Sequence, residues 1–172
     1  LFHQNQGGDY VNTDGRNVWF EENECDQTGL ESPQTDGPIV HWAKTDQTIR
    51  GNTITVTVGT ANGRWGIIGY GSARQNKAAN YLEDNVINGG GIHMANTNLM
   101  HVTGNTVNDW LILGTDVSCL VFEDNAINYG GVENYKFRRV TGEASGNTLN
   151  GEPFDLPMTN DEPFTNSPPH MW

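Results

Sequence analysis

Short stretches of the chain alternate between hydrophobic and polar residues, and each stretch runs into an asparagine. An apolar residue stands three positions before this asparagine, as Phe20, Ile49 and Val102 do, and another stands two positions after it, as Val107 does. Alternation with a period of two is typical of β-strands that bury one face, and no stretch has the sustained spacing of an amphipathic helix. The pattern therefore predicts an all-β protein of short strands.

The asparagines that end these stretches recur along most of the chain. They are Asn23, Asn52, Asn85, Asn105, Asn125 and Asn147. Successive members are 29, 33, 20, 20 and 22 residues apart, and a period near 20 with insertions indicates a solenoid. In a parallel coil each turn returns its asparagine to the same corner, about 4.8 Å from the last. We therefore expect the side-chain amides to form a ladder of hydrogen bonds.

Each repeat is predicted to contain a first strand, a tight corner at the asparagine, a short second strand, a loop and a third strand. The residue before the asparagine is usually glycine or aspartate, as in Gly104 and Asp84, which suits a left-handed corner. Candidate third strands span 38–42, 66–70, 91–95, 111–114 and 131–135.

Two repeats carry a specific resemblance. The stretches HVTGNTVND (101–109) and FEDNAINYGGVEN (122–134) are similar to the right-handed parallel β-helix repeats of the pectate-lyase-like superfamily. The resemblance covers roughly 9–151 and implies a single-stranded right-handed β-helix of about six turns. Because this fold carries lyases, hydrolases, epimerases and inert spikes, the resemblance implies architecture more strongly than activity.

The two ends of the repeat region differ. Residues 152–172 are rich in proline and do not repeat, so we expect them to form a tail that caps the β-helix of residues 1–151. The start has no comparable cap, and we expect further chain or a partner chain there, as in a longer protein or a homotrimer. The two cysteines lie about four turns apart, beyond disulfide reach, so both are expected to be free thiols, with Cys25 in the core.

The net charge of the chain limits the kinds of molecule that it is expected to bind. The chain has 9 Lys and Arg against 21 Asp and Glu, a net charge of −12. Nucleic-acid binding needs clustered basic residues and is not expected. No apolar run reaches the 18 residues of a membrane span, so no membrane insertion is expected either. Together with the resemblance, this favours an extracellular, virion or cell-surface protein that meets a polysaccharide.

Three insertions indicate where a ligand would bind. They span 26–37, 56–65 and 71–80, and loops on a rigid scaffold are common sites of function. In the superfamily that the chain resembles, the working groove runs along the outer face of one sheet between such loops. We therefore expect the groove over the third strands of the first three full turns.

Alignment of the third strands by their core residues assigns the outward positions. Ile92, Leu111 and Val132 are placed inside, so that His93 and Glu133 face outward. His41 faces outward if Val40 is the core residue, and the opposite register stays open.

The residues around this face suggest a binding site for sugars. Aromatic rings beside polar groups suit the C–H faces of sugar rings, and basic residues suit an acidic polymer. The substrate-binding candidates are Trp42, Trp65, Tyr70, Lys44 and Arg64.

The sequence leaves the chemistry, and whether there is any, open. Glycoside hydrolysis needs two carboxylates, for which the candidates are Asp36, Asp46, Asp84, Asp116 and Glu133. β-Elimination from a uronate polymer needs a base and a cation. For this the catalytic candidates are His41, His93, Arg74 and Lys77. The motifs of polygalacturonases and pectate lyases are absent. The alternative is a non-catalytic spike, fibre or cell-surface module.

No cofactor is expected. The five histidines lack the spacing of a zinc site, and the two cysteines are isolated. Calcium stays open because acidic loops occur at 12–17 and 45–48, although neither is a defined calcium-binding loop.

Overall fold

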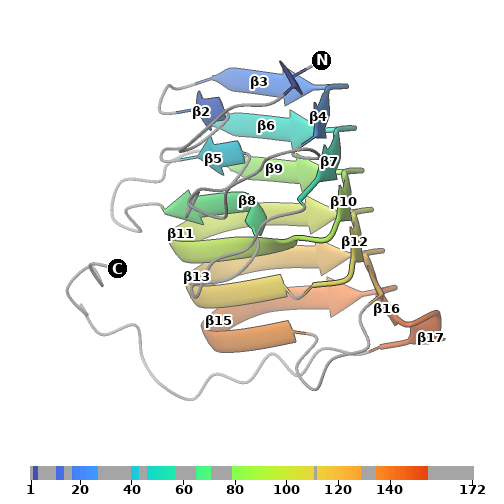
Figure 1. The fold of residues 1–172 in the computed structure, drawn as a ribbon. Coiled ribbons are helices and arrows are strands. Elements are labelled where there is room, and N and C mark those ends of the chain that lie inside the picture. Colours follow the sequence, from blue (N-terminus) through green and yellow to red (C-terminus); the bar gives the residue numbers. More distant parts are fainter. Residues whose placement is uncertain are drawn as a thin grey trace.

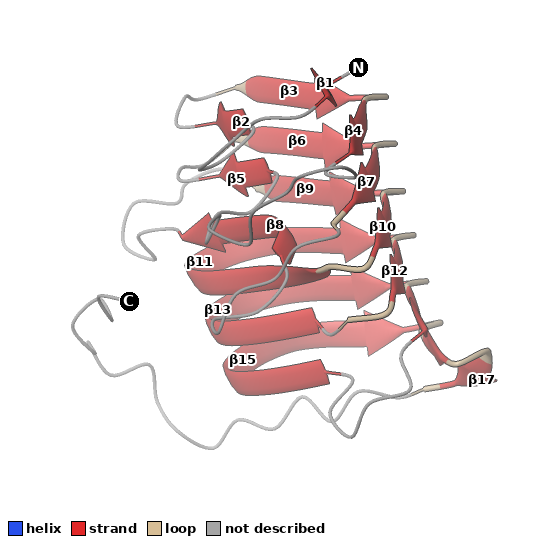
Figure 2. Ribbon diagram, viewed as in Figure 1, coloured by secondary structure: helices blue, strands red, loops and turns tan. Residues whose placement is uncertain are grey.

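The computed structural model is all-β, with no helix among the residues that it describes (Figure 2). These residues are 2–3, 11–13, 17–26, 40–42, 46–56, 65–70, 79–110, 112–128 and 135–154. Within them, no helix is long and apolar enough to cross a membrane.

The described strands form two sheets. The short-strand sheet has the order β1 (Phe2–His3), β4 (Glu24–Asp26), β7 (Thr53–Thr55), β10 (Val86–Asn88), β12 (Thr106–Asn108), β14 (Ala126–Asn128), β16 (Thr148–Leu149) and β17 (Glu152–Pro153). The second sheet has the order β2 (Val11–Thr13), β5 (Val40–Trp42), β8 (Trp65–Tyr70), β11 (Gly91–Thr103), β9 (Asn80–Glu83), β6 (Gln47–Arg50) and β3 (Val18–Glu21), with β13 (Ile112–Glu123) and β15 (Tyr135–Ser145) following β11.

Equivalent strands of successive repeats lie side by side, so the chain winds as a parallel β-helix (Figure 1). Val86 of β10, for example, pairs in parallel with Thr53 of β7 on one side and Thr106 of β12 on the other. The predicted fold is confirmed, but the number of turns differs. The described residues trace about three complete turns rather than six.

Third strands run on into the next first strands without a break in β11, β13 and β15. Each of these long strands bends at a residue with positive φ: Asn96 at 50°, Asp116 at 56° and Arg139 at 52°. The prediction of separate strands was wrong for these turns, because one left-handed residue turns the corner without ending the ladder of backbone hydrogen bonds. We call the part before the bend, with β2, β5 and β8, the third-strand layer. The part after it, with β3, β6 and β9, is the first-strand layer.

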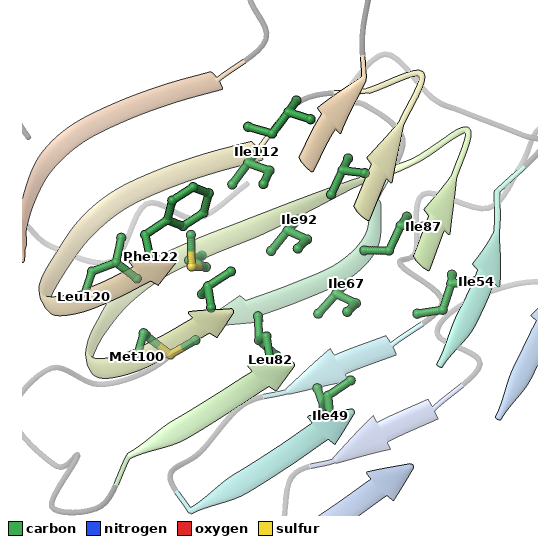
Figure 3. Close-up of a cluster of buried hydrophobic side chains, with 14 of the residues drawn as sticks. Ile49, Ile54, Ile67, Leu82, Ile87, Ile92, Met100, Ile112, Leu120 and Phe122 are labelled. Atoms are coloured by element: carbon green, nitrogen blue, oxygen red, sulfur yellow. The ribbon is translucent and has the colours of Figure 1, made fainter. Parts of the chain in front are cut away.

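The core consists of columns of apolar side chains that stack along the coil, as the alternation predicted (Figure 3). Three positions before the ladder asparagine, Ile49, Leu82, Val102 and Phe122 are at most 1 % exposed. Two positions after it, Cys25, Ile54, Ile87, Val107 and Ile127 are fully buried. Each turn thus packs the same two positions onto its neighbours, and the expected inward position of Cys25 is confirmed.

The corner between first and second strands carries the predicted ladder. The Nδ2 of Asn105 donates to Oδ1 of Asn125 at 3.0 Å, and its own Oδ1 accepts from Nδ2 of Asn85 at 2.9 Å. The same Nδ2 also donates to the carbonyl oxygen of Leu82 in the turn before, at 2.8 Å. The pattern continues from Asn23 to Asn147, and the members from Asn52 to Asn147 are at most 2 % exposed. One buried amide therefore connects three turns.

The residue before each ladder asparagine alternates between acidic and glycine, and the structure explains why. All of these residues have positive φ, including Asp84 at 54° and Gly104 at 66°. A Cβ at Gly104 would lie 2.3 Å from Oδ1 of Asp84, and a Cβ at Gly146 would lie 2.1 Å from Oδ1 of Asp124. The aspartate carboxylate of one turn therefore fills the space that a side chain would need at the equivalent corner position of the next turn. That position must be glycine.

A second amide ladder runs along the outer edge of the short strands. Nδ2 of Asn108 donates to Oδ1 of Asn88 at 2.8 Å, and Nδ2 of Asn128 donates to Oδ1 of Asn108 at 2.9 Å. The motif Asn-x-aliphatic-Asn thus supplies a buried ladder, a core side chain and a partly exposed ladder within four residues.

At the C-terminal end, β17 pairs antiparallel with β16. The N–H of Phe154 donates to the carbonyl oxygen of Asn147 at 2.8 Å, and its ring packs on the core. These contacts lie at the start of the predicted capping tail, whose remainder, 155–172, is outside the described residues.

The ladder gives a paired test of stability. We expect Asn105→Ala to lower the free energy of unfolding by about 1–3 kcal/mol, because buried groups lose their partners. Asn108→Ala, in the same motif, should cost less because water can reach the freed groups. Urea denaturation of both variants measures the difference. Equal losses would contradict the assignment of the buried ladder as the stabilising one.

Candidate functional site

The backbone register of the third-strand layer decides which residues face outward. Val40 pairs with Ile67, which pairs with Ile92, which pairs with Ile112, and the last three are fully buried. The first of the two registers considered for 38–42 is therefore the observed one. Ile92 pairs with Ile112 rather than with Leu111, which the sequence alignment had placed beside it, and Leu111 lies outside the described residues.

The next turn corrects the alignment further. Tyr135, and not Val132, holds the position that pairs with Ile112. Val132 and Glu133, which the alignment placed inside and outside, lie outside the described residues.

Two outward columns follow from this register. The first contains Asn12, His41, Ile68, His93, Leu113 and Lys136. The second contains Tyr70, Ala95, Thr115 and Arg138. Trp65 pairs with Gly91 at the other margin of the same face. Of the candidates, His93 and Trp65 lie on this face, and the backbone positions of His41 and Tyr70 belong to the same two columns.

The backbone of Trp42 belongs to another column. It pairs with Gly69, which pairs with Met94, and Met94 is fully buried in the core. The side chain of Trp42 lies outside the described part of the chain, so its role in binding stays a prediction.

The outer face is open over its last turns and covered over the middle ones. Ile68, His93 and Ala95 are 5–6 % exposed although the pleat directs them away from the core. Leu113 and Thr115 are partly exposed, and Arg138 is exposed. Among the outward residues whose exposure is described, the accessible ones therefore lie on β13 and β15. The exposure of Asn12, His41 and Tyr70 lies outside this description, so the site expected over the first three turns stays a prediction.

His93 lies against Trp65 on this face. The two ring centroids are 4.9 Å apart, with a tilt of 37° between the planes. Burial lowers the pKa of His93 from 6.5 to about 4, because the charged imidazolium would lose its hydration. At neutral pH the ring is uncharged and carries no proton to donate as an imidazolium acid. Its low proton affinity also makes it a weak general base.

The remaining basic candidates belong to segments that the structure does not describe. Lys44, Arg64, Arg74 and Lys77 lie outside the described residues, as does Asp36 of the carboxylate candidates. Their roles stay predictions.

The described carboxylate candidates lie at corners. Asp46 and Asp84 are exposed and have positive φ, which agrees with a role in the turns. Asp116 is 2 % exposed, and its carboxylate accepts two hydrogen bonds from Arg139, one of them from Nη2 at 2.6 Å. A carboxylate held by a guanidinium at a buried corner is occupied structurally, and the described candidates do not form a catalytic pair on the outer face.

Two basic residues of this face were missed from the sequence. Lys136 and Arg138 occupy the same outward columns as His93 and Ala95. The alternation Tyr-Lys-Phe-Arg at 135–138 was the available signal, since Phe137 packs on the core and Arg138 beside it is exposed. The alignment of Val132 instead of Tyr135 with the core column concealed this signal.

The cysteine and metal predictions can be compared with the structure only in part. Cys25 is a free thiol, and burial raises its pKa to about 11. The side chain of Cys119 lies outside the described part of the chain, so its state stays a prediction. No three His, Cys, Asp or Glu side chains gather as metal ligands among the residues that the structure describes.

Comparison with known proteins adds no relative. No protein-family model, no curated protein and no solved structure matches this chain. The parallel β-helix is therefore established by the structure alone.

The buried histidine makes stability depend on pH. Because the folded pKa of about 4 is below the unfolded value of 6.5, the unfolded chain takes up a proton first as the pH falls. Stability should be full above pH 6.5 and fall by about 2 kcal/mol by pH 5 from this group alone. His93→Gln should lose that dependence in urea denaturation at pH 7.5 and 5. Parallel losses in wild type and variant would contradict it.

Proposed function

We propose that the protein recognises an acidic extracellular polysaccharide through the outer face of the third-strand layer. The observation that carries the proposal is the register, which gathers Trp65, His93 and Arg138 with the positions of His41 and Tyr70 on one surface. Aromatic rings suit the C–H faces of sugars, and a guanidinium suits a carboxylate.

The charge of this face supports an acidic ligand. The chain has a net charge of −12, yet the outward columns of the described third strands contain no aspartate or glutamate. They contain Lys136 and Arg138 instead, and Arg138 is exposed. On the third-strand layer a uronate polymer would therefore meet fewer carboxylates than on the outer face of the first-strand layer. Arginine can hold a carboxylate through two parallel hydrogen bonds, which fixes the orientation of the sugar.

The geometry favours binding over acid–base chemistry at His93. A neutral, covered imidazole packed against Trp65 fixes the shape of the face and does not deliver a proton at neutral pH. Cleavage would need a base or acid from elsewhere, and the hydrolase and lyase alternatives both remain compatible with the proposal. We also propose that the chain is a member of the pectate-lyase-like superfamily, because two of its repeats resemble the repeats of that superfamily.

Binding to a uronate polymer tests the proposal. We expect polygalacturonate oligomers to bind in isothermal titration calorimetry, and Arg138→Gln to weaken binding about tenfold through the loss of a charge-assisted contact. Arg138→Lys should retain part of the affinity, because it keeps the charge but not the paired hydrogen bonds. Val86→Ala, an exposed change on the short-strand sheet, is the control.

Two results would overturn the proposal. One is the absence of binding to acidic and neutral polysaccharides alike, which would favour the spike or fibre module. The other is binding that Arg138→Gln leaves unchanged. New reducing ends or unsaturated products after incubation would add cleavage to recognition and distinguish hydrolysis from elimination.

A further inference from the structure

The outer face of the first-strand layer carries a row of aromatic residues that the proposed site does not use. In successive strands the outward column reads Trp19, Thr48, Tyr81, His101 and Val121. Trp19 is 66 % exposed, and among the described residues only Val86 is a second large hydrophobic side chain that is exposed. An exposed tryptophan on a regular sheet gains nothing from burial and is available to a ligand.

The aromatic rings of this row are held in place. Nε1 of Trp19 donates to Oδ1 of Asn17 at 3.1 Å, which restrains the indole. Tyr81 and His101, one turn apart, stack with centroids 4.9 Å apart and planes at 23°. Rings that are already ordered lose little conformational freedom when a ligand packs on them.

A row of charged residues runs beside the aromatic row, two positions along each strand. Four of its six residues are charged, namely Glu21, Arg50, Glu83 and Glu123, and the other two are Thr103 and Ser145. Nη2 of Arg50 lies 2.7 Å from Oε1 of Glu21, and its Nη1 lies 3.9 Å from Oε2 of Glu83. One guanidinium thus faces two carboxylates, and Glu123 adds a further negative charge.

We propose that this aromatic and acidic face is a second binding site, for an amino-sugar polymer with free amines. Ammonium groups are attracted both by carboxylates and by the faces of tryptophan and tyrosine, while the C–H faces of the sugar rings pack on the same aromatic side chains. The columns continue from turn to turn, about 4.8 Å apart. A polymer along the coil axis therefore meets an aromatic residue with a glutamate two positions along the strand at Trp19, and again two turns later at Tyr81.

Charge separates this site from the first one. The described third strands present Arg138 and no carboxylate on their outer face, whereas the first-strand layer presents Glu21, Glu83 and Glu123 with Arg50 between two of them. An acidic polymer is therefore disfavoured on the first-strand layer, and the second site does not depend on the function proposed above.

Calorimetry with a glucosamine oligomer that carries free amines, and with its N-acetylated counterpart, tests the inference. The amine form should bind about tenfold more tightly than the neutral form at low salt, and the difference should shrink as salt is added. Trp19→Ala and Glu83→Gln should each weaken binding of the amine form about three- to tenfold. Glu24→Gln, which removes an exposed carboxylate from the short-strand sheet, should change it less than about twofold.

Three outcomes would overturn the inference. The first is no binding of the amine form by a protein whose melting shows that it is folded. The second is equal affinity for the amine and N-acetylated forms. The third is binding of polylysine as tight as that of the amino sugar, with Trp19→Ala having no effect on either, which would mean a general attraction to cations. Trp19 is largely exposed, so its variant is expected to fold, and its melting temperature checks this.

Discussion

The structure depends on a column of asparagine amides that fixes every turn to the next. From Asn52 to Asn125, each member donates to the turn after it and to a backbone carbonyl of the turn before it, as Asn105 does with Asn125 and Leu82. A buried amide that misses these partners carries a desolvation cost, so a slip of one residue is disfavoured at every corner. The ladder therefore sets the register that all other columns inherit.

The inherited register gives the coil outer faces of different character. Because side chains alternate along each strand, the core columns leave fixed outward columns between them. The third-strand layer then presents Arg138 without carboxylates, and the first-strand layer presents Trp19 and Tyr81 beside glutamates. A chain with a net charge of −12 thus distributes its few basic residues unevenly, and this distribution carries the proposals about ligands.

Burial changes what the residues of a face can do. His93 stands in an outward column, but its cover and its contact with Trp65 keep the ring neutral and hold it in place. Arg138 stands three turns further along the coil than Tyr70 in its column, and it is exposed and charged. The same face therefore combines a packed part, which shapes it, with an open part, which can contact a ligand.

The sequence by itself determined the parallel β-helix fold. The asparagine spacing and the alternation of apolar residues are local patterns, and both recur in every repeat. Asn85, Asn105 and Asn125 recur at one spacing, and residues such as Leu82 and Val107 reveal the core columns. The tertiary structure decided the bends and the sites. The bends lie at Asn96, Asp116 and Arg139, which have positive φ but are of three residue types, so no sequence pattern predicted them. The pairing of Tyr135 with Ile112 and the contact of Trp65 with His93 each join two turns, and alternation within one strand cannot fix such contacts.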